Sequence, residues 1–244
     1  MKFQDEKVEI WEGDLDSFNA FLPEWEKLLS SEERERARRY HFEKDRRHFT
    51  ASRALLRLLL GKKLDKAADA LIFHYSEYGR PFLKEGHHSN PLNFNLSHSH
   101  GRFLLATAWN RRLGVDLEFI RHDVSFDSIA NRYFAQEERE AIAAEPEEGK
   151  APLFFRYWTL KEAFMKAQGK GLSYSLSRFS VRWNRSENRA TLSIPDEPRE
   201  ASRWSLSFLK SQPDFVACLA LEGSEIPVRS HSLENIMKLS KQVK

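Results

Sequence analysis

The chain has 244 residues, and its 41% hydrophobic and 31% charged residues are typical of a globular protein rather than a fibrous or fully disordered one. The net charge is 39 − 36 = +3, so a basic surface would have to come from local clustering of Lys and Arg. A single cysteine, Cys218, excludes an internal disulfide framework and a cysteine-only zinc site, and it suits a reducing compartment.

The first half of the chain predicts two helices among short strands. A Ser30-x-x-Glu33 pattern is a capping box that begins a short Arg-rich helix, and a second helix is predicted from 45 to 60 with its end at Gly61. Alternating apolar residues predict strands, which in chain order cover 1–12, 71–84 (two strands around a Tyr-Gly-Arg-Pro turn), 92–97, 103–109 and 115–118.

The second half repeats this plan. We expect a helical stretch over 126–144, a polar loop over 145–152 and an apolar helix over 153–168 that stops at Gly169. The last 13 residues fit a basic amphipathic helix or a frayed tail. The similar order of the halves indicates an internal duplication or a chance likeness of helix-then-hairpin segments. Strands are predicted over 179–183, 190–194, 204–208 and 215–221.

The sequence shows neither a leader nor a membrane span. The first 14 residues are charged throughout and contain no apolar core. The longest aliphatic stretch, Leu55 to Leu60, is interrupted by Arg57 and is far shorter than the roughly 20 residues that a bilayer needs. We therefore expect a cytoplasmic protein that does not contact a membrane.

Two acids lie two positions apart in a predicted strand. Asp116 and Glu118 would point to the same face, while the apolar Val115 and Leu117 point to the other. Adjacent carboxylates repel unless a cation lies between them, and Mg²⁺ suits such a pair because it binds one or two carboxylates together with substrate phosphates. The alternative from the residues alone is a half-exposed strand whose acids face water.

A second group of chemically useful residues lies on the predicted helix over 153–168. Trp158, Glu162 and Lys166 follow each other at intervals of four, so they share one stripe of the helix with Phe155 nearby. A Glu and a Lys beside large aromatic side chains would be partly desolvated, which is where perturbed acids and bases occur. The alternative is an exposed Glu–Lys pair that stabilises the helix by a few tenths of a kcal/mol.

A third group is the segment Asn-Leu-Ser-His-Ser-His-Gly at 95–101. Its amides and Ser97 could donate to a phosphate, and a charged His98 could pair with that anion. The segment could instead be only a soluble turn, or His98 and His100 could chelate a metal, although zinc would need a third ligand.

Arginines gather before residue 58, and Arg is suited to bidentate phosphate contacts. A solvated helix face explains most of them, because glutamates lie among them. The competing functions are a nucleic-acid-binding module and a metal-dependent phosphohydrolase; the small net charge and the lack of a nucleic-acid-binding motif speak against the former. The clustered residues are Arg34, Arg36, Arg38, Arg39, Arg46, Arg47, Arg53 and Arg57.

In their order and spacing, these segments resemble the surfactin-synthetase-activating (Sfp-type) 4′-phosphopantetheinyl transferases. The strongest matches are Gly-Val-Asp-Leu-Glu at 114–118 and Trp-Thr-Leu-Lys-Glu-Ala-Phe-Met-Lys at 158–166, the latter followed by Gly-Lys-Gly-Leu. The resemblance implies an α+β fold, a pseudo-dimer of two similar α/β subdomains (1–113 and 114–244) with the active site in the cleft between them. It also implies transfer of the 4′-phosphopantetheine group of coenzyme A to a serine of an apo acyl or peptidyl carrier protein, with Mg²⁺ or Mn²⁺, releasing adenosine 3′,5′-bisphosphate.

The resemblance implies a role for each matching residue. Asp116, Glu118 and Glu162 are implied to be metal ligands, and Glu162 is also implied to be the base, directly or through water. Lys166 and His98 are implied to be catalytic and to contact coenzyme A. We expect a monomer whose partners are coenzyme A and an acidic apo carrier protein, without nucleic acid. The other implied contacts of coenzyme A are Arg36, Arg47, Arg53, Arg80, Ser97 and Lys161.

Overall fold

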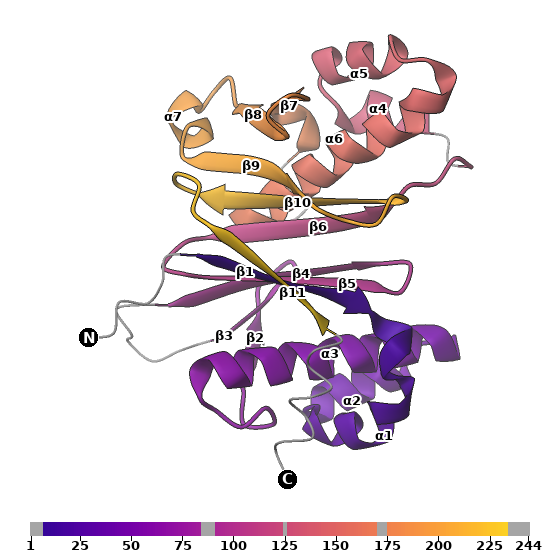
Figure 1. The fold of residues 1–244 in the computed structure, drawn as a ribbon, viewed down its shortest axis with the longest axis vertical. Helices are drawn as coiled ribbons and strands as arrows, with labels where there is room; N and C mark the ends of the chain where they lie inside the picture. Colours follow the sequence, from indigo (N-terminus) through magenta and orange to yellow (C-terminus); the bar gives the residue numbers. More distant parts are fainter. Residues whose placement is uncertain (1–6, 84–90, 124–125, 170–174, 234–244) are drawn as a thin grey trace.

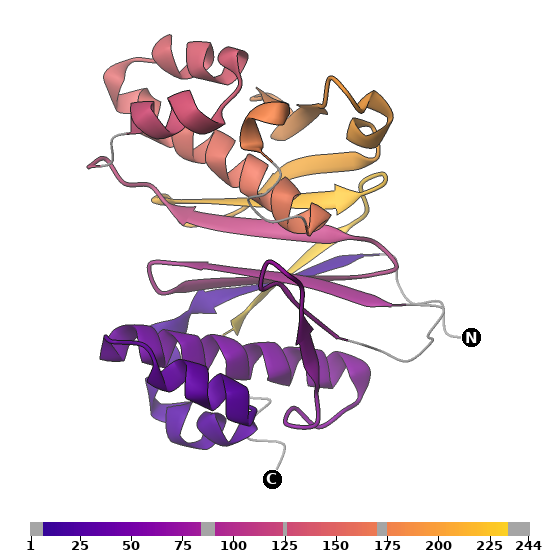
Figure 2. The ribbon, with the colours of Figure 1, turned by 180° about the vertical axis from the view of Figure 1, so that it is seen from behind.

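The computed structural model describes residues 7–83, 91–123, 126–169 and 175–233. Two β-sheets of four and five strands lie face to face, and helices cover the outer face of each sheet, so the chain forms four layers (Figure 1). Figure 2 shows the same layers from behind. The predicted α+β fold class is confirmed. None of the helices in these described ranges is long and apolar enough to span a membrane.

The first sheet has the strand order β11-β1-β5-β4, and α3 packs along its outer face with α1 and α2 beyond it (Figure 1). Ser30 and Glu33 form the predicted capping box at the start of α2. A small hairpin of β2 and β3 stands beside this sheet (Figure 2). The bounds are β1 Val8–Asp14, η1 Leu15–Phe21, α1 Leu22–Trp25, η2 Glu26–Leu28, α2 Ser31–Arg38, α3 Glu43–Leu64, β2 Phe73–Tyr75, β3 Pro81–Leu83, β4 Leu92–Ser99, β5 Arg102–Trp109 and β11 Val228–Ser232.

The second sheet has the strand order β6-β10-β9-β8-β7, and α6 packs along its outer face with α4 and α5 beyond it (Figure 1). The predicted strands of this half are present. Gly169 ends α6 with a φ of 69°, a left-handed conformation that glycine adopts without strain. The bounds are β6 Leu113–Phe119, α4 Phe126–Tyr133, α5 Gln136–Ala143, α6 Glu147–Gln168, η4 Leu176–Arg178, β7 Ser180–Asn184, β8 Arg189–Ser193, α7 Pro198–Ala201, β9 Trp204–Leu209 and β10 Phe215–Glu222.

The two halves share one plan. In each, a first strand (β1 or β6) is followed by an eight-residue helix (α2 or α5), a 22-residue helix (α3 or α6) and a hairpin whose last strand pairs with the first. The strands that end the two hairpins, β5 and β10, each bury six consecutive residues. A strand covered on both faces is expected to be apolar throughout. The indicated duplication of the halves is therefore visible in the topology.

One strand departs from the division at residue 113. Residues 228–232 form β11, which pairs in parallel with β1 in the first sheet, although the sequence assigned them to the second half. The chain thus returns to its N-terminal half after completing the second sheet. The suggested helix or tail of the last 13 residues lies outside the described residues from 234 onward.

The inner faces of the two sheets form a shared core. Ile10 and Leu104 of the first sheet belong to the same buried cluster as Val115 and Leu219 of the second. These side chains exclude water between the sheets, and each large aliphatic residue stabilises the fold by about 1.5–3 kcal/mol through burial. Because β6 lies in this core, its backbone is fixed and its alternate side chains face the junction with β4.

Two predicted helices have different boundaries in the structure. The helix α3 passes through Gly61 and ends at Leu64. Gly61 serves a close approach instead, because a Cβ there would lie 2.7 Å from the carbonyl oxygen of Lys66. The helix predicted over 126–144 is broken into α4 and α5, since the chain is extended at Ala135, whose N–H donates to Glu138 Oε2.

The polar loop predicted over 145–152 is confirmed only at residues 145 and 146. Residues 147–152 instead form the first turns of α6, which begins at Glu147. Glu147 and Glu148 lie in the first turn, where the helix dipole favours negative charge. The polar composition therefore marked a solvated helix start.

Candidate active site

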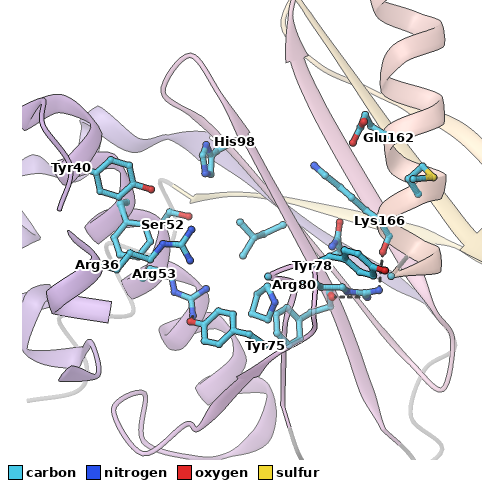
Figure 3. Close-up of a pocket in the computed structure, with 18 residues that line it drawn as sticks. Arg36, Tyr40, Ser52, Arg53, Tyr75, Tyr78, Arg80, His98, Glu162 and Lys166 are labelled. Carbon is cyan, nitrogen blue, oxygen red and sulfur yellow. Dashed lines mark hydrogen bonds between the residues drawn. The ribbon is translucent and has the colours of Figure 1, made fainter. Parts of the chain in front are cut away.

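A cavity of about 510 Å³ lies between the two halves, where the sequence placed the site. The N-terminal half contributes α2, α3, the β2–β3 hairpin and β4, and the C-terminal half contributes α6. Figure 3 shows cationic and aromatic side chains on the first wall, facing Glu162 and Lys166 of α6 on the second. The two walls thus differ in chemistry as well as in origin.

Asp116 is the most buried of the predicted site residues on β6, at 3% exposure. Its Oδ1 accepts a hydrogen bond from Ser97 Oγ at 3.0 Å and pairs with Lys166 Nζ at 2.6 Å. Its Oδ2 is buried and has no hydrogen-bond partner among the described residues. An unpaired buried carboxylate oxygen is costly, so this atom favours a cation as its missing partner.

Glu118 and Glu162 lie close enough to Asp116 to repel it. Burial, followed by the charge of Asp116, raises the pKa of Glu118 above its ordinary value. Burial, Asp116 and Glu118 raise the pKa of Glu162 to about 7, although Lys166 opposes this shift. The three carboxylates therefore form an acidic group whose negative charge the ammonium group of Lys166 balances only in part. Within the described residues, no three His, Cys, Asp or Glu side chains already surround one metal position.

Lys166 and His98 face the cavity from opposite walls (Figure 3). Lys166 Nζ also bonds to Ser97 Oγ at 3.0 Å, so the ammonium group is held beside Asp116. Desolvation in the cavity, followed by the charge of Lys166, lowers the pKa of His98, so the imidazole is neutral at pH 7. An anion bound in the cavity would favour its protonated form.

The comparisons with known proteins cover both walls. Residues 11–110 match the family model of the 4′-phosphopantetheinyl transferase N-terminal region, and residues 112–220 match that of the 4′-phosphopantetheinyl transferase superfamily. The chain is 36% identical over 218 residues to the 4′-phosphopantetheinyl transferase HetI of Nostoc sp., and this similarity covers 89% of each chain. The chain belongs to the 4′-phosphopantetheinyl transferase superfamily. The resemblance drawn from the motifs is confirmed, and with it the class of enzyme.

Two further 4′-phosphopantetheinyl transferases match across most of their length. The chain is 32% identical over 170 residues to psf-1 of Bacillus pumilus, covering 69% of this chain and 70% of that protein. It is 29% identical over 169 residues to Sfp of Bacillus subtilis (strain 168), covering 69% of this chain and 72% of that protein. The family is therefore supported by relatives from more than one genus.

Lys161 of this phosphopantetheinyl transferase lies outside the cavity. Its side chain is 0% exposed, and its Nζ donates to both carboxylate oxygens of Glu138 at 2.8 Å and to the carbonyl of Phe179 at 2.6 Å. Neighbouring helix positions point about 100° apart, so Lys161 faces the protein interior while Glu162 faces the cavity. This corrects the expectation that Lys161 contacts coenzyme A.

Ser97 is also placed differently from the expectation. It is a buried residue whose hydroxyl bonds to Asp116 and Lys166, and it is not among the residues that line the cavity. Side chains alternate along β4, so the neighbouring His98 points to the cavity wall while Ser97 points to β6. Ser97 therefore contacts the acidic group rather than the open space.

Arg80 lines the cavity, but backbone carbonyls occupy its guanidinium group. Its Nη1 donates to the carbonyls of Lys166 at 2.8 Å and Ala167 at 3.4 Å, and its Nη2 donates to those of Phe94 and Leu113 at 3.4 and 3.3 Å (Figure 3). The carbonyls of Lys166 and Ala167 lie in the last turn of α6. Those of Phe94 and Leu113 lie in β4 of the N-terminal half and β6 of the C-terminal half. Arg80 thus compensates the negative end of α6 and joins the walls.

The three arginines selected from the Arg-rich helices have different positions. Arg36 and Arg53 line the cavity. Arg53 is held by Glu33 Oε1, at 2.9 Å from Nε and 2.5 Å from Nη2, and it donates to the Tyr75 hydroxyl at 2.9 Å. Arg47 is outside the cavity lining, because it lies two positions before Phe49, which lines the cavity, and so points about 200° away around α3.

The sequence reasoning missed the aromatic wall. Tyr75 and Tyr78 of the β2–β3 hairpin line the cavity, together with Tyr40 after α2. Tyr75 and Tyr78 are exposed large aromatic residues, which is unusual unless a ligand covers them. Tyr78 is the first residue of the Tyr-Gly-Arg-Pro turn and Tyr75 lies three positions before it, so this turn is the signal in the sequence that could have identified them.

Proposed function

We propose that this chain transfers the 4′-phosphopantetheine group of coenzyme A to the serine hydroxyl of an apo acyl or peptidyl carrier protein and releases adenosine 3′,5′-bisphosphate. The chemical difference between the cavity walls carries this proposal. Coenzyme A presents phosphates and an adenine ring, which suit a wall of arginines and tyrosines. Its pyrophosphate reacts at phosphorus, which suits the acidic group and lysine opposite. Because one chain supplies both walls, we propose that it acts as a monomer.

Asp116, Glu118 and Glu162 would hold Mg²⁺, or Mn²⁺ in its place. The buried, unpaired Oδ2 of Asp116 supports this, and so do the pKa values of Glu118 and Glu162, which burial and the neighbouring carboxylates raise. Carboxylate oxygens are the ligands that these hard cations prefer. When bound, the ion would neutralise charge on the pyrophosphate.

The protein's own groups account for the movement of the proton and the charge. The serine oxygen bonds to the β-phosphorus, and the bond from this phosphorus to the oxygen that bridges to the α-phosphorus breaks. Glu162 takes the serine proton directly or through a water. The electron pair stays on the departing bisphosphate, where Lys166 and a protonated His98 balance its charge.

The proposal is tested by incubating the protein with coenzyme A, Mg²⁺ and a panel of apo carrier proteins, followed by intact-mass measurement of each carrier. We expect a gain of one phosphopantetheine group on at least one carrier, and no gain with a chelator until Mg²⁺ or Mn²⁺ is restored. Asp116→Ala and Glu162→Ala should abolish the gain, whereas Glu148→Ala, an exposed acid at the other end of α6, should not. Release of phosphate without modification of any carrier would contradict the proposal and favour a phosphohydrolase.

A further inference from the structure

The two halves meet where β4 lies beside β6. These strands belong to different sheets, and β6 is the edge strand of its own. An edge strand presents backbone N–H groups that need partners when buried. Three side chains of β4 supply these partners: Asn95 Oδ1 accepts from the N–H of Val115 at 2.9 Å, and the hydroxyls of Ser97 and Ser99 accept from those of Leu117 and Phe119 at 3.3 and 3.2 Å.

These contacts form a regular ladder. Each side chain of β4 reaches the residue exactly 20 positions later, and both strands advance two residues per step. Side chains two apart share one face of a strand, and the N–H groups of alternate residues point to the same side. The Asn-x-Ser-x-Ser pattern at 95–99 is therefore matched in period to the edge of β6.

The two serines also hold the acids of β6. The hydroxyl of Ser97 donates to Asp116 Oδ1 at 3.0 Å, and the hydroxyl of Ser99 donates to Glu118 Oε2 at 3.2 Å. A hydroxyl has one proton and two lone pairs. Because a lone pair of each serine already accepts a backbone N–H, its proton is directed to the carboxylate. One serine thus fixes both the backbone of β6 and the orientation of an acid.

We propose that Asn95, Ser97 and Ser99 form a positioning ladder that fixes β6 against β4, and that Ser99 is the positioning residue for Glu118. This inference rests on the proposed function, because it treats Glu118 as a metal ligand of the transfer reaction. Ser99 is the sharpest test of the ladder: unlike Ser97, its hydroxyl makes no contact with Lys166. Its half-exposed position also tolerates the extra methyl group of threonine.

The test compares Ser99→Ala and Ser99→Thr with a matched control, Ser205→Ala. Ser205 is a half-buried strand serine whose hydroxyl donates to the carbonyl of Leu221, away from the acidic group. We expect Ser99→Ala to raise the Mg²⁺ concentration for half-maximal transfer by about tenfold, as removal of a residue that supports a metal ligand usually does. The KM for coenzyme A should change less than twofold, and Ser99→Thr should recover most of the loss.

Two measurements do not depend on turnover. Electron paramagnetic resonance of Mn²⁺ without coenzyme A should show about tenfold weaker binding in Ser99→Ala, with recovery in Ser99→Thr. Hydrogen exchange should be faster in peptides that contain residues 115–119 of Ser99→Ala, because the N–H of Phe119 loses its acceptor. The Ser205→Ala control should match the wild type in both.

The outcomes separate the ladder from the function. If Ser99→Ala keeps wild-type Mn²⁺ binding and exchange while Glu118→Gln loses transfer, the ladder is wrong and the proposed function stands. If the wild type modifies no carrier but Ser99→Ala weakens Mn²⁺ binding, the proposed function is wrong and the ladder stands. A loss that Ser99→Thr does not recover, or a wild type that binds no Mn²⁺, overturns the ladder.

Discussion

The helices α3 and α6 have the same length and the same place in their halves, yet they do different work. Each has 22 residues and follows an eight-residue helix that contains the sequence Glu-Glu-Arg-Glu, at 32–35 and at 137–140. The second glutamate of this sequence is Glu33 in one half and Glu138 in the other. Both are buried, and each accepts the backbone N–H three residues earlier. The two halves therefore share the same frame, which consists of an eight-residue helix with a buried glutamate and the 22-residue helix that follows it.

Each of these glutamates pairs with a buried cation of the long helix. Glu33 forms ion pairs with Arg53 and Arg57, with Arg57 Nε at 2.7 Å from Oε2, whereas among the described residues Glu138 forms an ion pair with Lys161 alone. Burial alone would raise the pKa of Glu33, but the two arginines hold it below its ordinary value. Burial raises the pKa of Glu138 and lowers that of Lys161, so the second pair is closer to neutral.

The surfaces that face the cavity are not equivalent. The long helix of the first half presents Phe49, Ser52 and Arg53, whereas that of the second presents Glu162 and Lys166. In both halves a buried glutamate of the preceding helix pairs with the long helix, whereas the side chains that face the cavity differ in charge. The comparison supports the proposal that the N-terminal wall binds the anionic substrate and that the C-terminal wall carries the reaction.

Loss of the charge of Glu33 should have the largest effect on stability. Glu33→Gln leaves two buried arginines without a counter-charge, and arginine does not lose its proton in proteins. We expect the free energy of unfolding, measured with urea, to fall by about 3–5 kcal/mol. The control Glu35→Gln removes a surface ion pair with Arg39 and should cost less than about 1 kcal/mol. Equal losses in both variants would contradict the importance of the buried pair.

The acidic group predicts that the stability of the protein falls as the pH rises. The pKa of Glu162 is raised from 4.5 to about 7. A raised carboxyl pKa stabilises the fold fully below pH 4.5, and this contribution is lost as the pH rises through 7. Between these limits, the free energy of unfolding of the metal-free wild type should therefore fall by about 3 kcal/mol more than that of Glu162→Gln. Parallel pH profiles of the two proteins would show that Glu162 is not perturbed.

The lowered pKa of Glu33 predicts the reverse dependence of stability on pH. Its contribution to stability is present above the ordinary carboxyl pKa and is lost as the pH falls through its folded value. The wild type and Glu33→Gln should therefore converge in stability in acid, whereas the wild type and Glu162→Gln should diverge as the pH rises from 4.5 to about 7. The opposite dependence of stability on pH therefore distinguishes the two long helices, although the same elements surround them.

The second buried pair should be less sensitive than the first. Glu138→Gln leaves Lys161 without a counter-charge, but burial already lowers the pKa of Lys161, so this residue can release its proton. We expect a loss of about 1–3 kcal/mol in the free energy of unfolding, within the range for an unsatisfied buried polar group. Adding Lys161→Met should recover part of this loss. A loss as large as that of Glu33→Gln would break the distinction between the two pairs.

The sequence predicted the elements and faces that depend on local period. The acids of β6, the stripe of α6 that carries Glu162 and Lys166, and the helix end at Gly169 all follow from spacings of two to four residues. The repeated Glu-Glu-Arg-Glu segment did not by itself predict the buried ion pairs. Its meaning depends on a buried partner 20 or more positions away, which no local pattern contains.

The buried position of Lys161 and the backbone contacts of Arg80 were not predicted, and the reason is the same for both residues. Each lies in a motif associated with phosphate binding, and a cation in such a motif resembles a ligand contact. Lys161 is bound by a glutamate 23 positions earlier, and Arg80 by a helix end 86 positions later. The strand β11 likewise exists because β1 offers it an edge. Contacts that join distant segments decided these three cases.

The smallest predicted effect tests the binding wall alone. Arg36 lines the cavity and lies over the ring of Phe49 at 5.4 Å, whereas Arg38, on the same helix, is exposed and lies outside the cavity lining. Loss of one charged phosphate contact without change at the reacting phosphorus raises KM and leaves kcat unchanged. We expect Arg36→Ala to raise the KM for coenzyme A about tenfold, equal to about 1.4 kcal/mol, with kcat within twofold. Arg38→Ala should match the wild type. A fall in kcat at unchanged KM in Arg36→Ala would assign this arginine to the reaction. It would contradict the proposal that the N-terminal wall only binds coenzyme A.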